Sequence, residues 1–308
     1  MKTAVVTGAT GFIGGALVKQ LCGAGYYVYA VGRNKNRLDV LARMDNVSAI
    51  CADFSVYKQL HQQIGVEVDV FFHCAYSGGF GGEALKNYSL QLDNAKYACD
   101  AVACALKLES SKFVLASTIN TIEIQTILQD SPNASLRYTC IYSASKLVAE
   151  IIGKTLAYNN KMEFCTALIA MPYGEGNYAK TLPNIVMQQL INHIPPKLIT
   201  GENLYDLIYI DDVACGLLAV GESGKDLKNY YVGHRKLITF KKWMERIRNI
   251  ISPQTELGFG EYPDGPAVNY DLVDLDSLYL DTGFEVTSDF DESIRKTAAW
   301  LRNQENIL

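Results

Sequence analysis

The segment TGATGFIGGALVKQL, residues 7–21, follows directly on a short apolar run, TAVVT, at residues 3–7. Three glycines in it, Gly8, Gly11 and Gly14, are spaced three residues apart and lead into a helix-like apolar pattern. Glycines permit a tight turn and a close backbone approach, and a helix N-terminus presents free N–H groups to an anion. A glycine triplet alone is weak evidence, but this one lies in the first turn of a chain that alternates strands and helices. It therefore predicts a dinucleotide-binding turn between a strand and a helix.

Short apolar and β-branched runs continue to alternate with helical patterns through the first half of the chain. Besides residues 3–7, the expected strands are residues 26–32, 47–51, 68–74, 112–117 and 163–170. This alternation predicts an α/β fold, a doubly wound (Rossmann) parallel sheet with helices on both faces. Between the fourth and fifth strands, apolar residues recur with a helical period, which predicts one buried helix face. These residues are Leu85, Tyr88, Leu92, Ala95, Cys99, Val102 and Leu106.

After about residue 170 the pattern is less regular, and prolines and glycines separate shorter elements. We therefore expect residues 1–170 to form the dinucleotide-binding domain. Residues 171–308 are expected to form mainly a smaller, substrate-binding C-terminal lobe, with segments around 200–232 returning to the sheet.

Composition narrows the class of protein. With 28 basic and 33 acidic residues, a net charge of -5 and no basic stripe, the chain is not expected to bind nucleic acid. It has neither about 18 uninterrupted apolar residues nor the pattern of a secretory signal after Met1, so we expect a cytoplasmic protein without a membrane span. The 8 cysteines form no CxxC unit, which predicts reduced core residues and no metal site.

The end of the second strand bears on the choice of dinucleotide. An acidic residue there would bind the ribose hydroxyls of NAD, but this chain has Gly32 followed by Arg33, with Lys35 and Arg37 nearby. Cations suit a 2′-phosphate, so NADP is favoured and NAD is the alternative. A solvated basic turn is the purely structural interpretation. Asp53, at the end of the third strand, could accept a hydrogen bond from the adenine amino group or could cap a helix.

The stretch YTCIYSASKLVAE, residues 138–150, places Tyr142 and Lys146 one helical turn apart. A cation at that distance would stabilise a phenolate and lower the tyrosine pKa. In a chain this rich in tyrosine and lysine the spacing also arises by chance, so it needs the context of other motifs.

That context is a family resemblance. The spacing TGxxGxxG, the strand end FVLAST (residues 113–118) and YSASK (residues 142–146) together resemble the extended short-chain dehydrogenase/reductases. This family includes NAD(P)-dependent nucleotide-sugar epimerases, dehydratases and reductases. The segments YDLIYIDDVACGLLA (residues 205–219) and LDTGFEVTSDFDESIRKTAAWLR (residues 280–302) are similar to its C-terminal half.

The resemblance implies roles for four residues. Tyr142 would exchange a proton with the substrate oxygen, and Lys146 would lower the pKa of Tyr142 and hold the nicotinamide ribose. A hydroxyl at the end of the fifth strand would bind the reacting oxygen, and Thr118 is favoured over Ser117 for this role.

The candidate cofactor contacts combine the glycine turn, the strand ends and the family motifs. His73 is interpreted as structural, and Asp93 is an alternative to Asn94. The candidates are Gly8, Thr10, Gly11, Phe12, Ile13, Gly14, Arg33, Asp53, Phe54, Cys74, Ala75, Asn94, Tyr142, Lys146, Pro172 and Tyr173.

The chain departs from the family pattern where nucleotide-sugar enzymes commonly carry arginines. Ala170 stands near one such position, and YDLIYIDD (residues 205–212) and FGEYPDGP (residues 259–266) contain none. Two buried phosphate charges need cations or backbone donors. Lys180, Lys197 and Arg235 are the candidates to supply them.

The resemblance implies an NADP-linked oxidoreductase or epimerase that acts at a secondary alcohol or ketone carbon of a small-molecule substrate, a nucleotide-linked sugar. A dehydratase is disfavoured, because Ile119 and Asn120 follow Thr118 where an additional acid/base pair is usual, and Glu123 is too far along to assign. The alternatives are a reductase of small ketones, similar to dihydroflavonol reductases, and a non-catalytic dinucleotide sensor. Family dimers pack the helices expected at residues 85–108 and around Tyr142 against a partner, so a homodimer is an expectation; a fully internal apolar stripe is the alternative.

Overall fold

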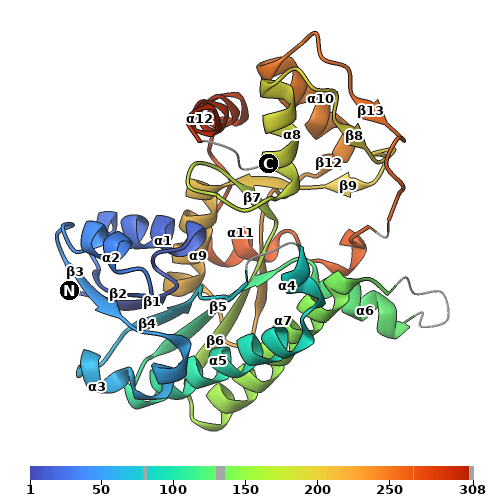
Figure 1. Ribbon diagram of the computed structural model, residues 1–308. Coiled ribbons are helices and arrows are strands. Elements are labelled where there is room, and N and C mark those ends of the chain that lie inside the picture. Colours follow the sequence, from blue (N-terminus) through green and yellow to red (C-terminus); the bar gives the residue numbers. More distant parts are fainter. Residues whose placement is uncertain (79–81, 130–135, 266, 305–308) are drawn as a thin grey trace.

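The computed structural model describes residues 1–78, 82–129, 136–265 and 267–304, and its centre is one parallel sheet (Figure 1). The order across the sheet is β11-β6-β5-β4-β1-β2-β3, and every neighbouring pair is parallel. These strands are β1 (Thr3–Thr7), β2 (Tyr27–Gly32), β3 (Val47–Cys51), β4 (Val70–His73), β5 (Lys112–Thr118), β6 (Glu163–Ile169) and β11 (Asn229–Val232). The predicted doubly wound α/β fold is confirmed, and the six predicted strands are all present.

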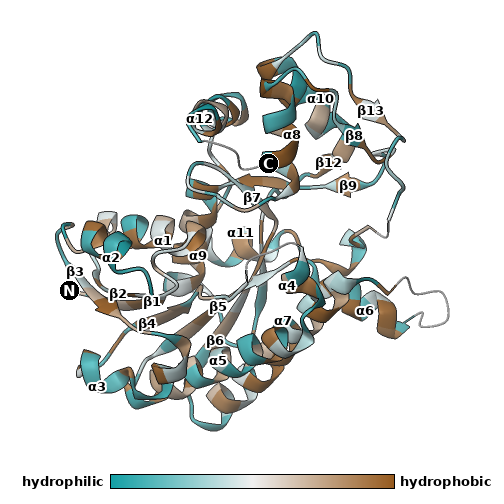
Figure 2. Cartoon of the chain, viewed as in Figure 1, coloured by the Kyte–Doolittle hydropathy of each residue, from teal (hydrophilic) through white to brown (hydrophobic). Residues whose placement is uncertain are grey.

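Helices cover both faces of the sheet, which explains why the strands are continuous apolar runs rather than alternating ones. Helix α1 (Phe12–Gly23) packs with α9 (Ile210–Ser223) on one face, and α5 (Tyr88–Lys107) packs with α7 (Tyr138–Asn159) on the other. Two apolar clusters fill the spaces between sheet and helices. Figure 2 shows the strands at the centre of the sheet mostly in the hydrophobic colours. Shorter elements join them: α2 (Lys35–Leu41), η1 (Phe54–Gln59), α3 (His61–Ile64), α4 (Glu83–Lys86) and α6 (Thr121–Gln129).

The predicted buried face of the helix after β4 is partly wrong. The helix begins only at Tyr88, after the side chain of Asn87 has accepted a hydrogen bond from the Leu90 N–H. Ala95 and Val102 are buried as expected, but Tyr88 is 68% exposed and Leu92 is 56% exposed. Small and polar residues face the protein instead, because they allow α5 to approach α7 and the sheet closely. They are Gln91, Asn94, Ala98, Ala101 and Ala105.

A smaller lobe follows β6 and stands above the carboxyl ends of the strands (Figure 1). Helices α8 (Leu182–Ile191), α10 (Phe240–Ile251) and α12 (Phe290–Arg302) pack together there. Three two-stranded sheets complete it: β7 (Met171–Tyr173) with β10 (Leu207–Tyr209), β9 (Leu204–Tyr205) with β12 (Ile238–Thr239), and β8 (Lys197–Leu198) with β13 (Gly258–Phe259). The remaining elements are η3 (Tyr270–Leu272) and α11 (Ser277–Thr282).

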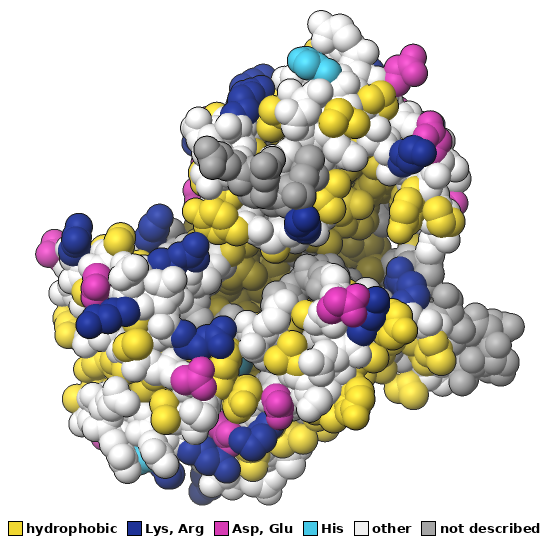
Figure 3. All heavy atoms as spheres, viewed as in Figure 1, with side chains coloured by type: hydrophobic (Ala, Val, Ile, Leu, Met, Phe, Trp, Pro, Cys, Tyr) yellow, Lys and Arg dark blue, Asp and Glu magenta, His cyan; other side chains and the backbone are white. Residues whose placement is uncertain are grey.

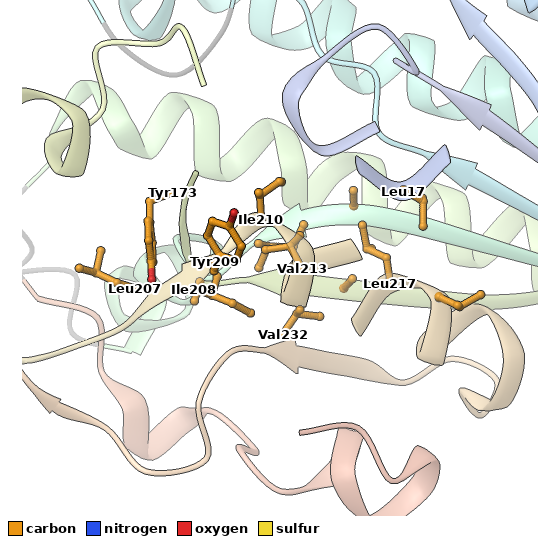
Figure 4. Close-up of a cluster of buried hydrophobic side chains, with 14 of the residues drawn as sticks. Leu17, Tyr173, Leu207, Ile208, Tyr209, Ile210, Val213, Leu217 and Val232 are labelled. Atoms are coloured by element: carbon orange, nitrogen blue, oxygen red, sulfur yellow. The ribbon is translucent and has the colours of Figure 1, made fainter. Parts of the chain in front are cut away.

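One apolar cluster is continuous from the sheet into the lobe. Leu17 of α1, Val213 and Leu217 of α9 and Val232 of β11 lie in the same cluster as Tyr173 of β7 (Figure 4). The chain from β10 through α9 to β11 therefore connects the lobe to the sheet by packing as well as by sequence.

Two sequence expectations concern cysteines and membranes. All eight cysteines are free; Cys104 and Cys165 are buried, but Cys51 is exposed at the end of β3, so interpreting every cysteine as a core residue was wrong. Within the described ranges, no helix combines the length and the apolar character that crossing a bilayer requires.

Candidate active site

The glycine turn after β1 is built as the sequence predicts. Gly8 has φ +73, and a Cβ atom there would lie 2.7 Å from the backbone of Ala75 at the end of β4. A Cβ atom on Gly14 would lie 2.2 Å from the Gly8 carbonyl oxygen. Gly11 precedes the first turn of α1 without any side-chain cap, so the helix N-terminus is left to bind an anion. The turn therefore fits a pyrophosphate, and Thr10, Phe12 and Ile13 are the residues around it.

Two arginines flank the end of β2. The Arg33 guanidinium lies 4.9 Å from the ring centre of Phe54, and its NH1 lies 3.9 Å from the Asp53 carboxylate. Arg37 lies on the other side, where its NH1 donates to the Thr10 carbonyl at 3.0 Å. A Cβ atom on Gly32 would lie 2.8 Å from the Thr10 side chain, so a carboxylate at this position would require Thr10 to move.

Asp53 is a helix N-cap in the structure. Its carboxylate accepts from the Ser55 N–H at 3.1 Å at the start of η1. Of the two alternatives for this residue the capping contact is present, and the proposed adenine contact stays a prediction.

The end of β4 passes under the glycine turn. His73 is 3% exposed and is hydrogen-bonded to the Thr7 hydroxyl at 2.9 Å. Burial, and then the nearby Lys146, lower the His73 pKa to about 3, so this side chain is a neutral structural group. Burial also raises the pKa of the Cys74 thiol to about 12, with Lys146 opposing the rise.

Asn94 of α5 holds the chain just after β4. Its amide accepts from the Ser77 N–H at 2.8 Å and donates to the Ser77 carbonyl at 3.0 Å. Asn94 thus makes two hydrogen bonds to the backbone of one residue, and its support of the active site stays a prediction.

Tyr142 and Lys146 lie on the buried side of α7, 8% and 9% exposed. Burial raises the Tyr142 pKa above its usual value; the nearby Tyr76 adds to the rise, and a hydrogen bond with the Thr118 side chain opposes it. Burial lowers the Lys146 pKa to about 8, and the Lys146 ammonium donates to the Ala116 carbonyl at 3.1 Å. The pair is therefore largely buried at the carboxyl end of β5.

Ser117 and Thr118 end β5 beside Tyr142. The Thr118 side chain is hydrogen-bonded to Tyr142, and the Thr118 hydroxyl also accepts from the Asn120 N–H at 3.2 Å. The Ser117 hydroxyl is buried and has no hydrogen-bond partner in the described part of the chain. The hydrogen bond with Tyr142 supports Thr118 over Ser117, and the role of either hydroxyl stays a prediction.

A cavity of about 210 Å³ opens beside these residues, between the sheet and the lobe. Figure 3 shows a hollow between the two parts of the molecule, with hydrophobic side chains in its depth. Phe12 and Ile13 line the cavity from the glycine turn, Tyr142 and Thr118 from the sheet side, and Pro172 from β7. Tyr173 instead points to the lobe, where its hydroxyl lies 2.5 Å from the Ser293 hydroxyl.

The sequence predicts a substrate-binding lobe but not which of its residues line this cavity. Tyr205, Asp206 and Tyr270 line it, although they are more than 60 residues beyond Tyr142 in the chain. The Asp206 carboxylate is 1% exposed and accepts from the Tyr231 hydroxyl at 2.6 Å and from the His234 ring at 2.7 Å. The available sequence signal was Asp206 in the segment YDLIYIDD, but no local pattern predicts which cavity this side chain lines.

The expected phosphate-binding cations are not gathered at this cavity. Among the described residues that line it, none is a lysine or an arginine. Arg235 is bonded to Asp276 and Glu285 instead. In the same described ranges, no group of three histidine, cysteine or acidic side chains is placed to hold a metal ion.

Comparisons with known proteins agree with this architecture. The model of the NAD dependent epimerase/dehydratase family matches residues 4–233. The dTDP-4-dehydro-6-deoxyglucose reductase of Escherichia coli is 23% identical over 318 aligned positions, covering 97% of either chain. CDP-abequose synthase of Salmonella typhimurium is 25% identical over 260 positions, covering 81% of either chain. The crystal structure of UDP-glucose 4-epimerase with UDP-glucose from Thermotoga maritima has a TM-score of 0.78 at 18% identity, covering 97% of this chain and 98% of the epimerase.

Proposed function

This chain belongs to the NAD dependent epimerase/dehydratase family, and from that premise we propose that it is an NADP-linked oxidoreductase or epimerase. It acts at a secondary alcohol or ketone carbon of a nucleotide-linked sugar, with Tyr142 as the acid/base. The observation that carries the proposal is the joint placement of Tyr142 and Thr118 on one cavity, with the Lys146 ammonium buried one turn along α7.

These residues divide the work at the reacting oxygen. The Thr118 hydroxyl binds that oxygen and orients it toward the Tyr142 phenol, which gives up or takes the proton. The positive charge of Lys146 lowers the free energy of the phenolate that Tyr142 becomes after giving up its proton. The cavity wall of Phe12, Ile13 and Pro172 limits the access of water to the reacting carbon.

The nicotinamide cofactor, when bound, supplies the hydride acceptor or donor. The glycine turn and the α1 N-terminus would hold its pyrophosphate, and Arg33 and Arg37 would flank its adenosine ribose. We propose NADP rather than NAD because the residues directly after β2 include three cations, Arg33, Lys35 and Arg37, and no carboxylate.

Reductase and epimerase chemistry need the same three residues. A reductase or dehydrogenase releases its product after one hydride transfer, whereas an epimerase rotates the ketone intermediate and reduces it again on the other face. A dehydratase needs a further acid/base group, and Glu123 is bonded to Arg137 at 2.7 Å. We therefore propose reduction, oxidation or epimerisation ahead of dehydration.

A thermal-shift titration identifies the nucleotide. Purified protein saturated with NADPH is mixed with UDP, CDP, GDP or dTDP in turn. We expect one of the four to stabilise the fold by about 2.7 kcal/mol at ~100 times its dissociation constant, which raises the melting temperature visibly. NADH in place of NADPH is the control for cofactor choice.

The same titration can favour a second function. The cavity is lined by Met171, Tyr205, Val268 and Tyr270, and among its described lining residues the only charged group is Asp206. Such a lining suits a neutral ketone better than a diphosphate. If none of the four nucleotides changes the melting temperature, the nucleotide-sugar assignment is wrong and a reductase of small ketones takes its place.

We also propose a homodimer through α5 and α7. Leu92 of α5 and Val148 of α7 border one apolar groove, and Ile151 on the same helix is 56% exposed. A contiguous exposed apolar surface of this kind is typical of an interface. We expect the 34.0 kDa chain to sediment as a dimer at micromolar concentration, and the double variant Leu92→Glu/Val148→Glu to sediment as a monomer. Leu280→Glu, exposed on α11, is the control that should stay dimeric; a monomeric parent would refute the proposal.

A further inference from the structure

A second tyrosine, Tyr76, contacts both members of the candidate catalytic pair. It lies three residues beyond the end of β4. The centre of its ring lies 4.4 Å from the Lys146 ammonium. The same ring packs edge-on against the Tyr142 ring, with 5.3 Å between centres. Tyr76 is not among the described residues that line the substrate cavity.

Helix α5 fixes the place of this ring. The Tyr76 hydroxyl donates to the side-chain oxygen of Gln91, which is fully buried. The Gln91 amide in turn donates to the Ala84 carbonyl at 2.8 Å. The next residue, Ser77, is held at both backbone groups by Asn94. Moving the ring away from Lys146 would break the hydrogen bond to Gln91, while the bonds to Ser77 fix the backbone that follows.

The groups around Lys146 explain why an aromatic ring beside it would stabilise its ammonium. The titratable groups that face it are Cys74 and His73 from the end of β4 and Tyr76 after them, while Tyr142 lies one turn earlier on the same helix as Lys146. Among the described residues near Lys146, the polar side chains from helix α5 are the uncharged Gln91 and Asn94. Strand β5 contributes the Ala116 carbonyl. A buried ammonium without a carboxylate depends on dipoles and on aromatic faces for its stability.

We propose that Tyr76 is a positioning residue of this site, whose ring face keeps the Lys146 ammonium charged and in place beside Tyr142. This inference rests on the proposed function, in which that charge stabilises the Tyr142 phenolate. The ring acts through its negative face rather than through its hydroxyl, which donates to Gln91 and lies 3.5 Å from the Ser145 hydroxyl.

Two substitutions separate the ring from the hydroxyl. Tyr76→Phe keeps the aromatic face and loses the bond to Gln91. Tyr76→Leu loses that bond as well and also removes the face, while an apolar side chain still shields Lys146 from water. Both variants should lose similar stability, and only Tyr76→Leu should change the charge state of Lys146.

The pKa of Lys146 is measured directly by NMR on the full-length protein labelled with ¹³C at the lysine Cε positions. Lys146→Met identifies the resonance by its loss. Losing a favourable contact with the cation lowers a lysine pKa, so we expect Tyr76→Leu to lower the Lys146 pKa by ~1 pH unit. Tyr76→Phe should change it by less than about a third of that shift.

An unchanged Lys146 pKa in Tyr76→Leu would overturn the proposal, and so would an equal shift in Tyr76→Phe. Tyr76→Met is the second aliphatic variant if Tyr76→Leu does not fold, because methionine adapts to irregular spaces. The titration needs neither substrate nor cofactor. It can therefore fail while Tyr142 is catalytic, or succeed while the assigned reaction is wrong.

Discussion

Replacing Tyr142 by phenylalanine should slow turnover about a thousandfold and leave the fold and the cofactor affinity intact. In the proposed function the phenol exchanges a proton with the substrate oxygen, and positioned acid/base groups contribute about 10²–10⁴-fold to rate. We therefore expect kcat to fall by ~10³-fold in Tyr142→Phe, with NADPH binding within a few-fold of the parent. Single-turnover oxidation of NADPH, with the substrate class identified by the nucleotide titration, is the measurement.

Tyr138→Phe is the matched control for this experiment. Tyr138 lies one turn earlier on the same helix and is 57% exposed, so loss of its hydroxyl should leave kcat unchanged. If Tyr142→Phe kept more than about a tenth of the parental kcat, Tyr142 would not be the acid/base. A protein that binds NADPH but turns over no ketone in either form would be a dinucleotide sensor.

The direction of reaction should set the pH dependence. Burial raises the Tyr142 pKa, so the phenol is protonated at neutral pH and is ready to donate to a ketone. Alcohol oxidation needs the phenolate instead, and its rate should rise with pH. The Lys146 charge, with a pKa lowered to about 8, is lost over the same alkaline range and opposes that rise.

Local patterns predicted the cofactor end of this protein well. The glycine turn lies between a strand and a helix that are adjacent in the chain, so its geometry depends on neighbours in sequence. The strand ends at Ser117 and Thr118 and the helix of Tyr142 were likewise readable, since parallel strands gather their carboxyl ends at one edge.

The apolar face of α5 shows what periodicity leaves open. Leu92 belongs to the apolar pattern and is 56% exposed, whereas Gln91 is fully buried. A hydrophobic period says which residues share a helix face, but not whether that face packs inside the chain or against another copy. The buried face of α5 contains the small residues Ala98 and Ala101, which allow close packing of the helix.

Residues that act through long-range contacts were beyond local patterns. Tyr76 contacts Lys146, which lies 70 positions later in the sequence. Asp206 lines a cavity whose opposite wall is β5. Arg37 is held by the Thr10 carbonyl and lies 5.1 Å from the ring centre of Tyr178, a residue beyond β7. Such contacts depend on how the lobe rests on the sheet, which no single segment specifies.

Gly14→Ala should damage the cofactor turn more than any other single methyl group added to α1. The new Cβ atom would lie 2.2 Å from the Gly8 carbonyl oxygen, so α1 and the turn must separate. Overpacking of this kind costs about 1–3 kcal/mol, and the displaced N–H groups no longer converge on a pyrophosphate. We expect a lower melting temperature and at least about a tenfold loss of NADPH affinity, measured by fluorescence titration.

Gly23→Ala is the control for this prediction, because Gly23 ends the same helix and a Cβ atom there meets no other atom within 4 Å. Alanine favours a helix over glycine by about 1 kcal/mol, so this variant should melt no lower than the parent and bind NADPH equally well. If Gly14→Ala bound NADPH like the parent, the pyrophosphate would not rest on this turn. The cofactor assignment would then have to move to another part of the sheet edge, and with it the roles of Arg33 and Lys146. The two variants together separate crowding at the turn from the general effect of a methyl group on α1.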